Sequence, residues 1–391
     1  MNPRELESLI LLNRLLLSSR QPAWALLEQG HAASHIVTMI EEENLFDKAE
    51  ALKKIRLSFD AISDVEACLT RGDSIITIGD EIYPSWLKTI IDPPLVLYCR
   101  GSIESADISS VAVVGTRHPS FYGMNQAKRF CSDLARMGMT IVSGFARGID
   151  EIAHESALGI RYGRTIAVLG CGLDVDYPKE HRKLRDQIAE RGALVTEYAL
   201  GTLPRAENFP RRNRIIAGLS LGVLVVEAHS RSGSLITAHQ ALEQGKDVFA
   251  IPGPVDQLTS RGTHFLIKEG AALVEDPAEI LNHLSIAIKT VLPPRPAQLL
   301  ETKEVLPVSG DFNNLVLPME RDEIGEVRTE VESELPEVQV LGYLADGPKS
   351  YDQILNQFQI STAQAASVLM KLQLSGKIKK ELGGAFARAK I

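Results

Sequence analysis

The stretch Thr140–Asp150, with the sequence TIVSGFARGID, decides the fold. Thr140 and the two β-branched residues after it predict a short buried strand, and Gly144 and Gly148 bracket a turn with little side-chain bulk. Asp150 stands where a helix should begin, as an N-cap or first-turn acid. This order places backbone N–H groups and the positive end of a helix at one edge of a sheet, which suits a phosphate. A tight turn without a ligand is the alternative.

Strands and helices alternate around this stretch, from residue 110 to residue 285. Apolar runs that end in glycine or a polar residue predict strands at Val111–Val114, Thr140–Val142, Thr165–Leu169, Ala193–Thr196, Gly222–Val226, Asp247–Ile251 and Ala272–Val274. The stretches between them predict helices, among them Met124–Met137, Lys179–Arg191 and Pro277–Leu284. The alternation predicts an α/β fold with a doubly wound, mainly parallel sheet, whose carboxyl edge carries the ligand site.

The flanking regions predict smaller units. Residues 1–70 carry leucines at helical spacing and predict a small helical domain, of the sterile-alpha-motif or helix-hairpin kind, which we interpret first as a packing cap. Residues 71–290 hold the α/β domain. Residues 291–335 are proline-rich and acidic and predict a disordered linker. Residues 336–391 predict three helices and a hairpin, the pattern of a winged helix.

The third helix of the predicted winged helix decides its expected role. Its obvious polar readers are Gln364, Lys371 and Gln373. Because the helix offers so few polar side chains, we favour a protein-contact role for this domain slightly over the recognition of duplex DNA.

The composition excludes several classes of protein. The chain has 391 residues, of which 45% are hydrophobic and 24% charged, and this predicts a soluble protein of two or three domains. Its net charge of −8 argues against a polybasic coat for nucleic acid and is compatible with a local basic cleft. The scattered cysteines predict neither disulfides nor a metal site. The run Leu9–Leu12 is short, follows acids and is interrupted by polar residues, so it predicts neither a signal peptide nor a membrane span, and we expect a cytoplasmic protein. We also expect no cofactor.

Cationic and small polar residues gather where strands end. Arg117 follows a strand-end glycine, so its guanidinium should project over the carboxyl edge and bind a phosphate; an ion pair with Asp150 is the alternative. Three arginines flank Asn213 on one predicted helix and cannot all point one way. We expect one to pair internally, with Glu227 as the candidate, and one or two to face the ligand. The helix start at Ser232–Thr237 offers a second anion site.

Other residues could extend this track. Lys179 and Arg182 open a charged helix, for which a solvated helix face is an equal interpretation. Tyr177 or Phe209 could stack on a base, although such residues are more often core residues.

No motif predicts an enzyme. The chain lacks GxxxxGK[ST] and has no GxGxxG with a ribose-binding acid at the usual spacing. The scattered carboxylates Asp150, Glu197 and Glu227 leave one alternative, a nucleotide-binding protein or nucleoside-monophosphate phosphoribohydrolase of the lysine-decarboxylase-like group. Those enzymes carry PGGxGTxxE, whereas this chain reads PGPVDQLTSRGT from Pro252 and lacks the second glycine and the glutamate. We therefore expect no catalytic residues.

Eight motifs support a family resemblance, in the order VAVVGTR, SGFARGID followed by AH, TIAVLGCGLDVDYP, FPRRNRIIAGLS, VLVVEA, SGSLITA, VFAIPG and LIKEGA. Together they resemble the DNA-processing protein A family of bacteria, also called Smf. His264, where the family usually has asparagine, and Thr196 with the residues after it depart from the pattern. The resemblance implies an extended Rossmann fold that binds and protects single-stranded DNA, forms a homodimer and loads the RecA recombinase in natural transformation, without catalysis.

The resemblance and the strand-end chemistry together nominate one set of DNA-binding residues. They are Gly115, Thr116, Arg117, Ser143, Gly144, Ala146, Arg147, Gly148, Asp150, Gly170, Gly172, Lys179, Arg182, Arg211, Arg212, Asn213, Arg214, Ser232, Gly233, Ser234 and Thr237.

Overall fold

The computed structural model describes most of the chain in two units. One unit lies within residues 1–302 and the other within residues 303–391. The residues described are 2–17 and 20–291, followed by 340, 342–344, 347, 349, 351–358, 369, 372, 378–380 and 386–388.

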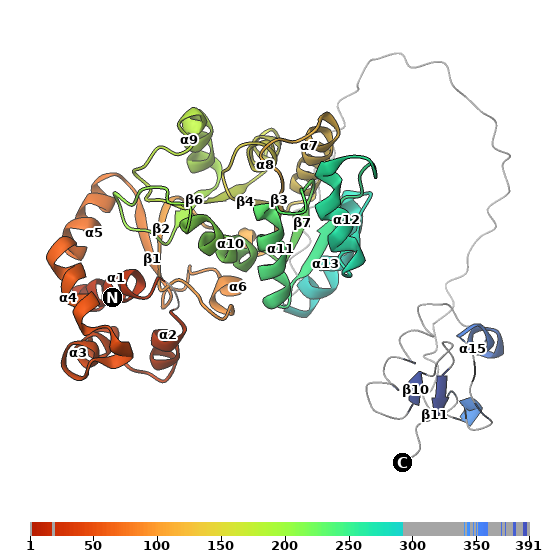
Figure 1. Ribbon diagram of the computed structural model, residues 1–391, viewed down its shortest axis with the longest axis horizontal. Coiled ribbons are helices and arrows are strands. Elements are labelled where there is room, and N and C mark those ends of the chain that lie inside the picture. Colours follow the sequence, from red (N-terminus) through yellow and green to blue (C-terminus); the bar gives the residue numbers. More distant parts are fainter. Residues whose placement is uncertain are drawn as a thin grey trace. The chain divides into compact units, whose positions relative to one another are not determined.

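A nine-stranded sheet forms the centre of the first unit as described (Figure 1), in the order β1-β2-β6-β5-β4-β3-β7-β8-β9. The pairs from β6 to β9 are parallel, whereas β1 and β2 are antiparallel additions at the β6 edge. The strands are β1 (Ser74–Thr77), β2 (Val96–Gly101), β3 (Ser110–Val114), β4 (Thr140–Ser143), β5 (Thr165–Val168), β6 (Ala193–Thr196), β7 (Gly222–Val225), β8 (Asp247–Ala250) and β9 (Ala272–Leu273). The predicted doubly wound, mainly parallel sheet is confirmed.

Helices cover both faces of this sheet. Figure 1 shows α7, α8 and α9 on one side and α10 and α11 on the other. The helices from α6 onward are α6 (Ser85–Lys88), α7 (Phe121–Arg136), α8 (Ile149–Leu158), α9 (Arg182–Arg191), α10 (Asn208–Leu219), α11 (Gly233–Glu243), α12 (Arg261–Lys268) and α13 (Pro277–Val291). Helix α7 begins three residues before the predicted Met124, because the Ser120 hydroxyl caps it by accepting the N–H of Gly123.

Strand β3 explains how the two faces are buried. Val111 and Val113 enter one hydrophobic core, and Ala112 and Val114 enter the other. Because successive side chains of a strand point to opposite faces, a strand buried on both sides must be apolar throughout. The continuous apolar run therefore marks a central strand.

The sheet order reverses at β3. The chain runs from β3 outward through β4, β5 and β6, then returns to place β7 on the other side of β3. In open α/β sheets a ligand crevice forms outside the carboxyl ends of the strands at such a reversal. We therefore expect the ligand crevice at the loops after β3 and β7.

The N-terminal residues are helical, as their leucine spacing predicts. Leu12, Ile36 and Leu52 of these helices share a hydrophobic core with Leu97 of β2 and Val168 of β5. The helices are α1 (Pro3–Leu15), α2 (Gln21–Glu28), α3 (Ala33–Glu43), α4 (Ala49–Ser58) and α5 (Ala61–Thr70). The boundary at residue 70 between a helical and an α/β domain stays a prediction.

The C-terminal unit contains a helix and a pair of antiparallel strands within its described residues. Helix α15 spans Tyr351–Phe358, and β10 (Ile378–Lys380) pairs antiparallel with β11 (Phe386–Arg388). Most of the predicted third helix, with Gln364, Lys371 and Gln373, lies outside the described residues, as does the predicted linker from 292 to 335.

Candidate binding groove at the carboxyl edge

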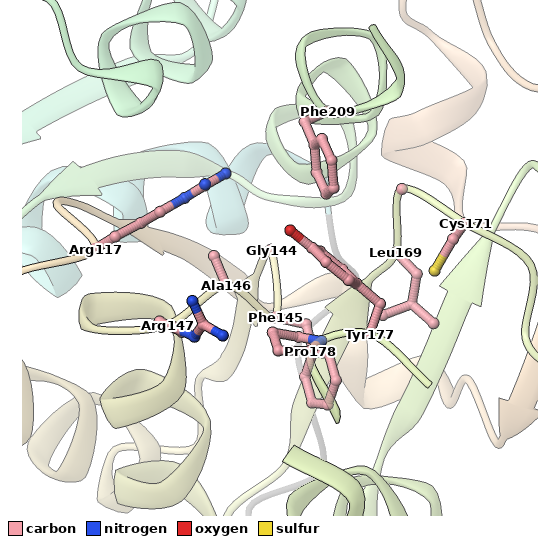
Figure 2. Close-up of a pocket in the computed structure, with 11 residues that line it drawn as sticks. Arg117, Gly144, Phe145, Ala146, Arg147, Leu169, Cys171, Tyr177, Pro178 and Phe209 are labelled. Carbon is pink, nitrogen blue, oxygen red and sulfur yellow. The ribbon is translucent and has the colours of Figure 1, made fainter. Parts of the chain in front are cut away.

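Two adjoining cavities lie at the carboxyl ends of β3, β4 and β5, and we call them together the carboxyl-edge groove. Arg117, Ala146, Tyr177 and Phe209 line both cavities. In the smaller one, Arg117 and Arg147 lie on the side opposite Leu169 and Cys171 (Figure 2). The larger one, of about 570 Å³, continues to the start of α11.

The groove contains most of the residues nominated from the sequence. They come from the turns after the strands and from the first two turns of α10 and α11. The nominated residues that line it are Gly115, Arg117, Gly144, Ala146, Arg147, Asp150, Gly170, Arg212, Asn213, Ser232, Gly233, Ser234 and Thr237.

The glycine turn after β4 is built around a buried carboxylate. Oδ2 of Asp150 accepts the backbone N–H groups of Gly144 at 3.2 Å and Ala146 at 3.3 Å. Burial raises the pKa of Asp150, and nearby Arg212 and these hydrogen bonds act in the opposite direction. Asp150 lies in the first turn of α8, as predicted, with Gly148 at the N-cap.

Two glycines make this turn possible. A Cβ on Gly144 would lie 2.7 Å from Asp150 Oδ2 and 2.8 Å from Arg212 Nη2. Gly148 has φ +81°, which L side chains rarely adopt, and a Cβ there would lie 2.6 Å from the carbonyl oxygen of Thr116. The spacing of glycines in the sequence therefore reflects close packing as well as backbone conformation.

Arg212 lines the larger cavity with an almost fully buried side chain. Its Nη1 donates to the carbonyl oxygen of Gly144 at 2.6 Å and to that of Val168, and it thereby joins the ends of β4 and β5. Its side chain is buried, and this desolvation lowers its pKa, with Asp150 opposing the shift. We infer that Arg212 shapes the wall of the groove by holding these two strand ends together.

Arg117 is exposed at the mouth of the groove. Its guanidinium carbon lies 5.9 Å from the centroid of the Phe209 ring. Within the described residues Arg117 belongs to no ion pair, so the expected alternative of a pair with Asp150 is not present. Its assignment to a phosphate stays a prediction.

The arginines at 211, 212 and 214 point in three directions. Arg211 is exposed and lines a different cavity. Arg214 pairs internally with Glu197 at 2.7 Å and Asp92 at 3.1 Å. The prediction that this partner is Glu227 is wrong, because the Glu227 carboxylate instead accepts hydrogen bonds from Ser120 and Thr259.

Glu227, which follows β7, connects the segments that precede α7 and α12. Its carboxylate accepts the Ser120 N–H at 2.8 Å, the Ser120 hydroxyl at 2.6 Å and the Thr259 hydroxyl at 3.1 Å. It therefore holds the start of α7 next to the segment before α12.

The start of α9 carries paired charges. Arg147 forms an ion pair with Glu180, and Arg182 forms one with Asp176 at 3.1 Å. Lys179 is exposed in the short 3-10 helix that precedes α9. Arg147 lines the groove, whereas Lys179 and Arg182 lie outside its lining.

The N-terminus of α11 faces the larger cavity. Ser232 is its N-cap residue and accepts the N–H of Ser234 at 3.3 Å, and their hydroxyls lie 2.7 Å apart. Thr237 follows one turn later on the same lining. Hydroxyls and backbone N–H groups at a helix start suit an anion.

Four nominated residues lie behind the groove. Ser143 is buried and its hydroxyl donates to the carbonyl oxygen of Val113 at 2.6 Å, so it joins β4 to β3. Thr116 and Gly148 pack together in the turn, and Gly172 packs against the carbonyl oxygen of Ala199. These residues support the lining.

Sequence reasoning missed the apolar part of the lining. Tyr177 and Phe209, which were considered for stacking, lie with ring centroids 5.6 Å apart. No sequence signal singled out the others, because an apolar residue at a groove looks like a core residue. They are Val114, Phe145, Leu169, Cys171, Pro178, Pro204, Ala206, Pro210, Ile216 and Ile236.

Two negative findings apply to the described residues. None of their histidines, cysteines and acids gather into a group that could hold a metal ion. No helix among them is long and apolar enough to cross a membrane.

Two family models and several known proteins match the sequence of this chain. The family model for DNA recombination-mediator protein A matches residues 74–285, and that for the DprA winged helix domain matches residues 326–384. Protein Smf of Escherichia coli is 43% identical over 287 residues, which cover 71% of this chain and 76% of that protein. DNA processing protein DprA of Streptococcus pneumoniae is 46% identical over 205 residues, covering 52% and 72%.

Two solved structures of DNA processing protein A also match the structure of this chain. The X-ray structure of DNA processing protein A from Streptococcus pneumoniae has a TM-score of 0.54 and 41% identity, and the match covers 60% of this chain and 81% of that one. A structure from Helicobacter pylori, which concerns the single-stranded DNA binding mode of its DNA processing protein A, has a TM-score of 0.50 and 33% identity, covering 55% and 96%.

Proposed function

The chain belongs to the DNA recombination-mediator protein A family, and from this premise we propose that it binds single-stranded DNA in the carboxyl-edge groove. The observation that carries the proposal is the exposed Arg117, which lies over the ring of Phe209 and shares a cavity with the N-terminus of α11. A cation and a helix N-terminus bind phosphate, and an aromatic face binds a base.

The groove gives each part of a nucleotide a partner. We assign phosphates to Arg117, to Arg147 and to the N-terminus of α11, and we assign stacking to Phe209 and Tyr177. Because phosphates and aromatic faces do not distinguish bases, binding should be nearly independent of sequence. The negative charge of the whole chain should confine binding to this groove.

The wider role follows the family. We propose that the protein protects incoming single strands and loads the RecA recombinase on them during natural transformation, as a cytoplasmic homodimer, without a cofactor or chemical turnover. Sedimentation of the protein with RecA, with and without single-stranded DNA, tests the partnership.

Competition binding tests the central proposal. A labelled dT oligonucleotide is titrated with the protein and then displaced by unlabelled single-stranded or duplex DNA of the same length. We expect the single strand to compete at least roughly tenfold better. Absent binding, or equal competition by duplex, would overturn the proposal.

A turnover assay addresses the alternative function. Incubation with AMP and chromatography of the products should show no free adenine. Adenine formed in proportion to protein would support the phosphoribohydrolase instead.

A further inference from the structure

A second cavity of about 510 Å³ lies between the N-terminal helices and the loop that joins β6 to α10. We call it the α1–α10 groove. Its lining comes from α1, from the end of α4 and from the start of α10. The cationic members of the lining are Arg14, Arg205 and Arg211.

The first turn of α10 separates this groove from the carboxyl-edge groove. Phe209 and Pro210 line the carboxyl-edge groove, whereas Asn208 and Arg211 line the α1–α10 groove. Nδ2 of Asn208 donates to the carbonyl oxygen of Gly170 at 3.0 Å, which fixes the turn to the end of β5. The wall between the two grooves is therefore one turn of helix.

The arginines of the α1–α10 groove are available to a ligand. Arg205 and Arg211 are exposed, and neither belongs to an ion pair within the described residues. Arg14 lies with its guanidinium carbon 4.3 Å from the centroid of the Phe59 ring. A cation stacked on an aromatic ring keeps its N–H groups free for a phosphate.

The lining of this groove contains fewer acids than arginines. Glu197 is buried, and its carboxylate is matched by Arg20 at 2.6 Å and Arg214 at 2.7 Å. Glu207 is the exposed acid of the lining. The lining side chains therefore include three arginines and a single exposed acid, while Asp64 and Asp174 accept the backbone N–H groups of Leu200 and Gly201 at the edge of the groove.

We propose that the α1–α10 groove binds the continuation of the same single strand, through its phosphodiester backbone. The inference rests on the proposed function of the carboxyl-edge groove. A strand that leaves Phe209 need only cross the first turn of α10 to meet Arg211 and Arg205. The N-terminal helices, through Arg14 and Phe59, then form one wall of a DNA site, beyond their role as a packing cap.

A length series tests the inference. Wild-type protein and the double variant Arg205→Gln/Arg211→Gln are titrated with dT oligonucleotides of about 5 and about 20 nucleotides. The variant should bind the short oligonucleotide as the wild type does and the long one on the order of tenfold more weakly. Its salt slope should be shallower by about 1.4 on the long oligonucleotide only, since two phosphate contacts are lost.

A matched control removes the same charge elsewhere. Lys128→Gln/Arg161→Gln replaces two exposed cations outside both grooves, and it should bind both oligonucleotides as the wild type does. Equal binding of the long oligonucleotide by Arg205→Gln/Arg211→Gln and wild type would overturn the inference and favour an acidic protein partner. Equal losses on both lengths would overturn it too, because the arginines would then act on a single site. Failure of the wild type to bind either oligonucleotide would instead overturn the proposed function.

Discussion

The guanidinium carbon of Arg117 lies 5.9 Å from the ring centroid of Phe209, although one follows β3 and the other begins α10. Arg212 approaches the same ring to 5.8 Å, but it is buried and already donates to Gly144. Phe209 therefore lies near one exposed cation and one buried, hydrogen-bonded cation.

Replacing Arg117 by alanine should weaken binding to dT and to mixed-sequence strands equally, since phosphate contacts carry no sequence information. The slope of log affinity against log salt should become shallower by about 0.7. Fluorescence anisotropy over a salt series measures both. Arg161→Ala, outside both grooves, is the control. Unchanged affinity and slope would contradict the assignment, and a large drop in Tm would show a structural role.

Replacing Phe209 by leucine should weaken binding by about 1–3 kcal/mol, the range of one stacked base. The salt slope should stay at the wild-type value, because an aromatic ring neutralises no phosphate. The same anisotropy series measures it, with Phe265→Leu, an exposed phenylalanine of α12 outside the grooves, as the control. A slope change as large as that of Arg117→Ala would argue against stacking.

Replacing Arg212 by methionine should lower the free energy of unfolding by roughly 3 kcal/mol, because the carbonyls of Gly144 and Val168 and the carboxylate of Asp150 lose their buried partner. Urea unfolding measures the change. Lysine at this position should recover only part of it, since one ammonium cannot reproduce the guanidinium fork. Full stability combined with lost DNA binding would make Arg212 a direct ligand.

Replacing Gly148 by alanine should cost about 1–3 kcal/mol, because its φ is +81° and the added Cβ would lie 2.6 Å from Thr116 O. Gly233→Ala provides the contrast, since a Cβ there meets nothing within 4 Å. Thermal unfolding of both variants, side by side, checks the prediction. Equal Tm values would show that the turn relaxes around the new side chain.

His154 should make stability depend on pH. The Thr165 hydroxyl donates to the carbonyl oxygen of Ile141 at 2.6 Å, so Nδ1 of His154 must donate to that hydroxyl, at 2.7 Å, and Nε2 lies buried without a partner. Burial, with smaller contributions from His181 and Arg212, lowers the pKa of His154 from 6.5 to about 3. The neutral ring is therefore the form that the fold accepts.

The sign of this pH dependence follows from proton binding. Between pH 6.5 and about 3 the unfolded chain binds a proton at His154 that the folded chain does not, so stability falls as pH falls through this window. The stability difference between wild type and His154→Gln should shrink by about 2 kcal/mol from pH 7 to pH 5. Urea unfolding at both pH values measures it, with exposed His118→Gln as the control. A constant difference would mean that His154 is protonated in the fold.

The sequence by itself determined the strands, their succession and the glycine turn. A strand buried on both faces must be continuously apolar, so Val111–Val114 is recognisable without knowing its neighbours. Gly144, Gly148 and Asp150 are likewise local requirements of one tight turn, and eight ordered motifs identified the family.

Only the tertiary structure decided which cations face the groove. Successive residues of a helix turn by about 100°, so Arg211, Arg212 and Arg214 had to diverge, but the pattern cannot say which side is solvent. Arg212 is buried where α10 packs against the sheet. Glu197 forms ion pairs with Arg214 and with Arg20 of the N-terminal region. A buried charge needs a partner, and partners brought together from distant parts of the chain exist only once the chain has folded.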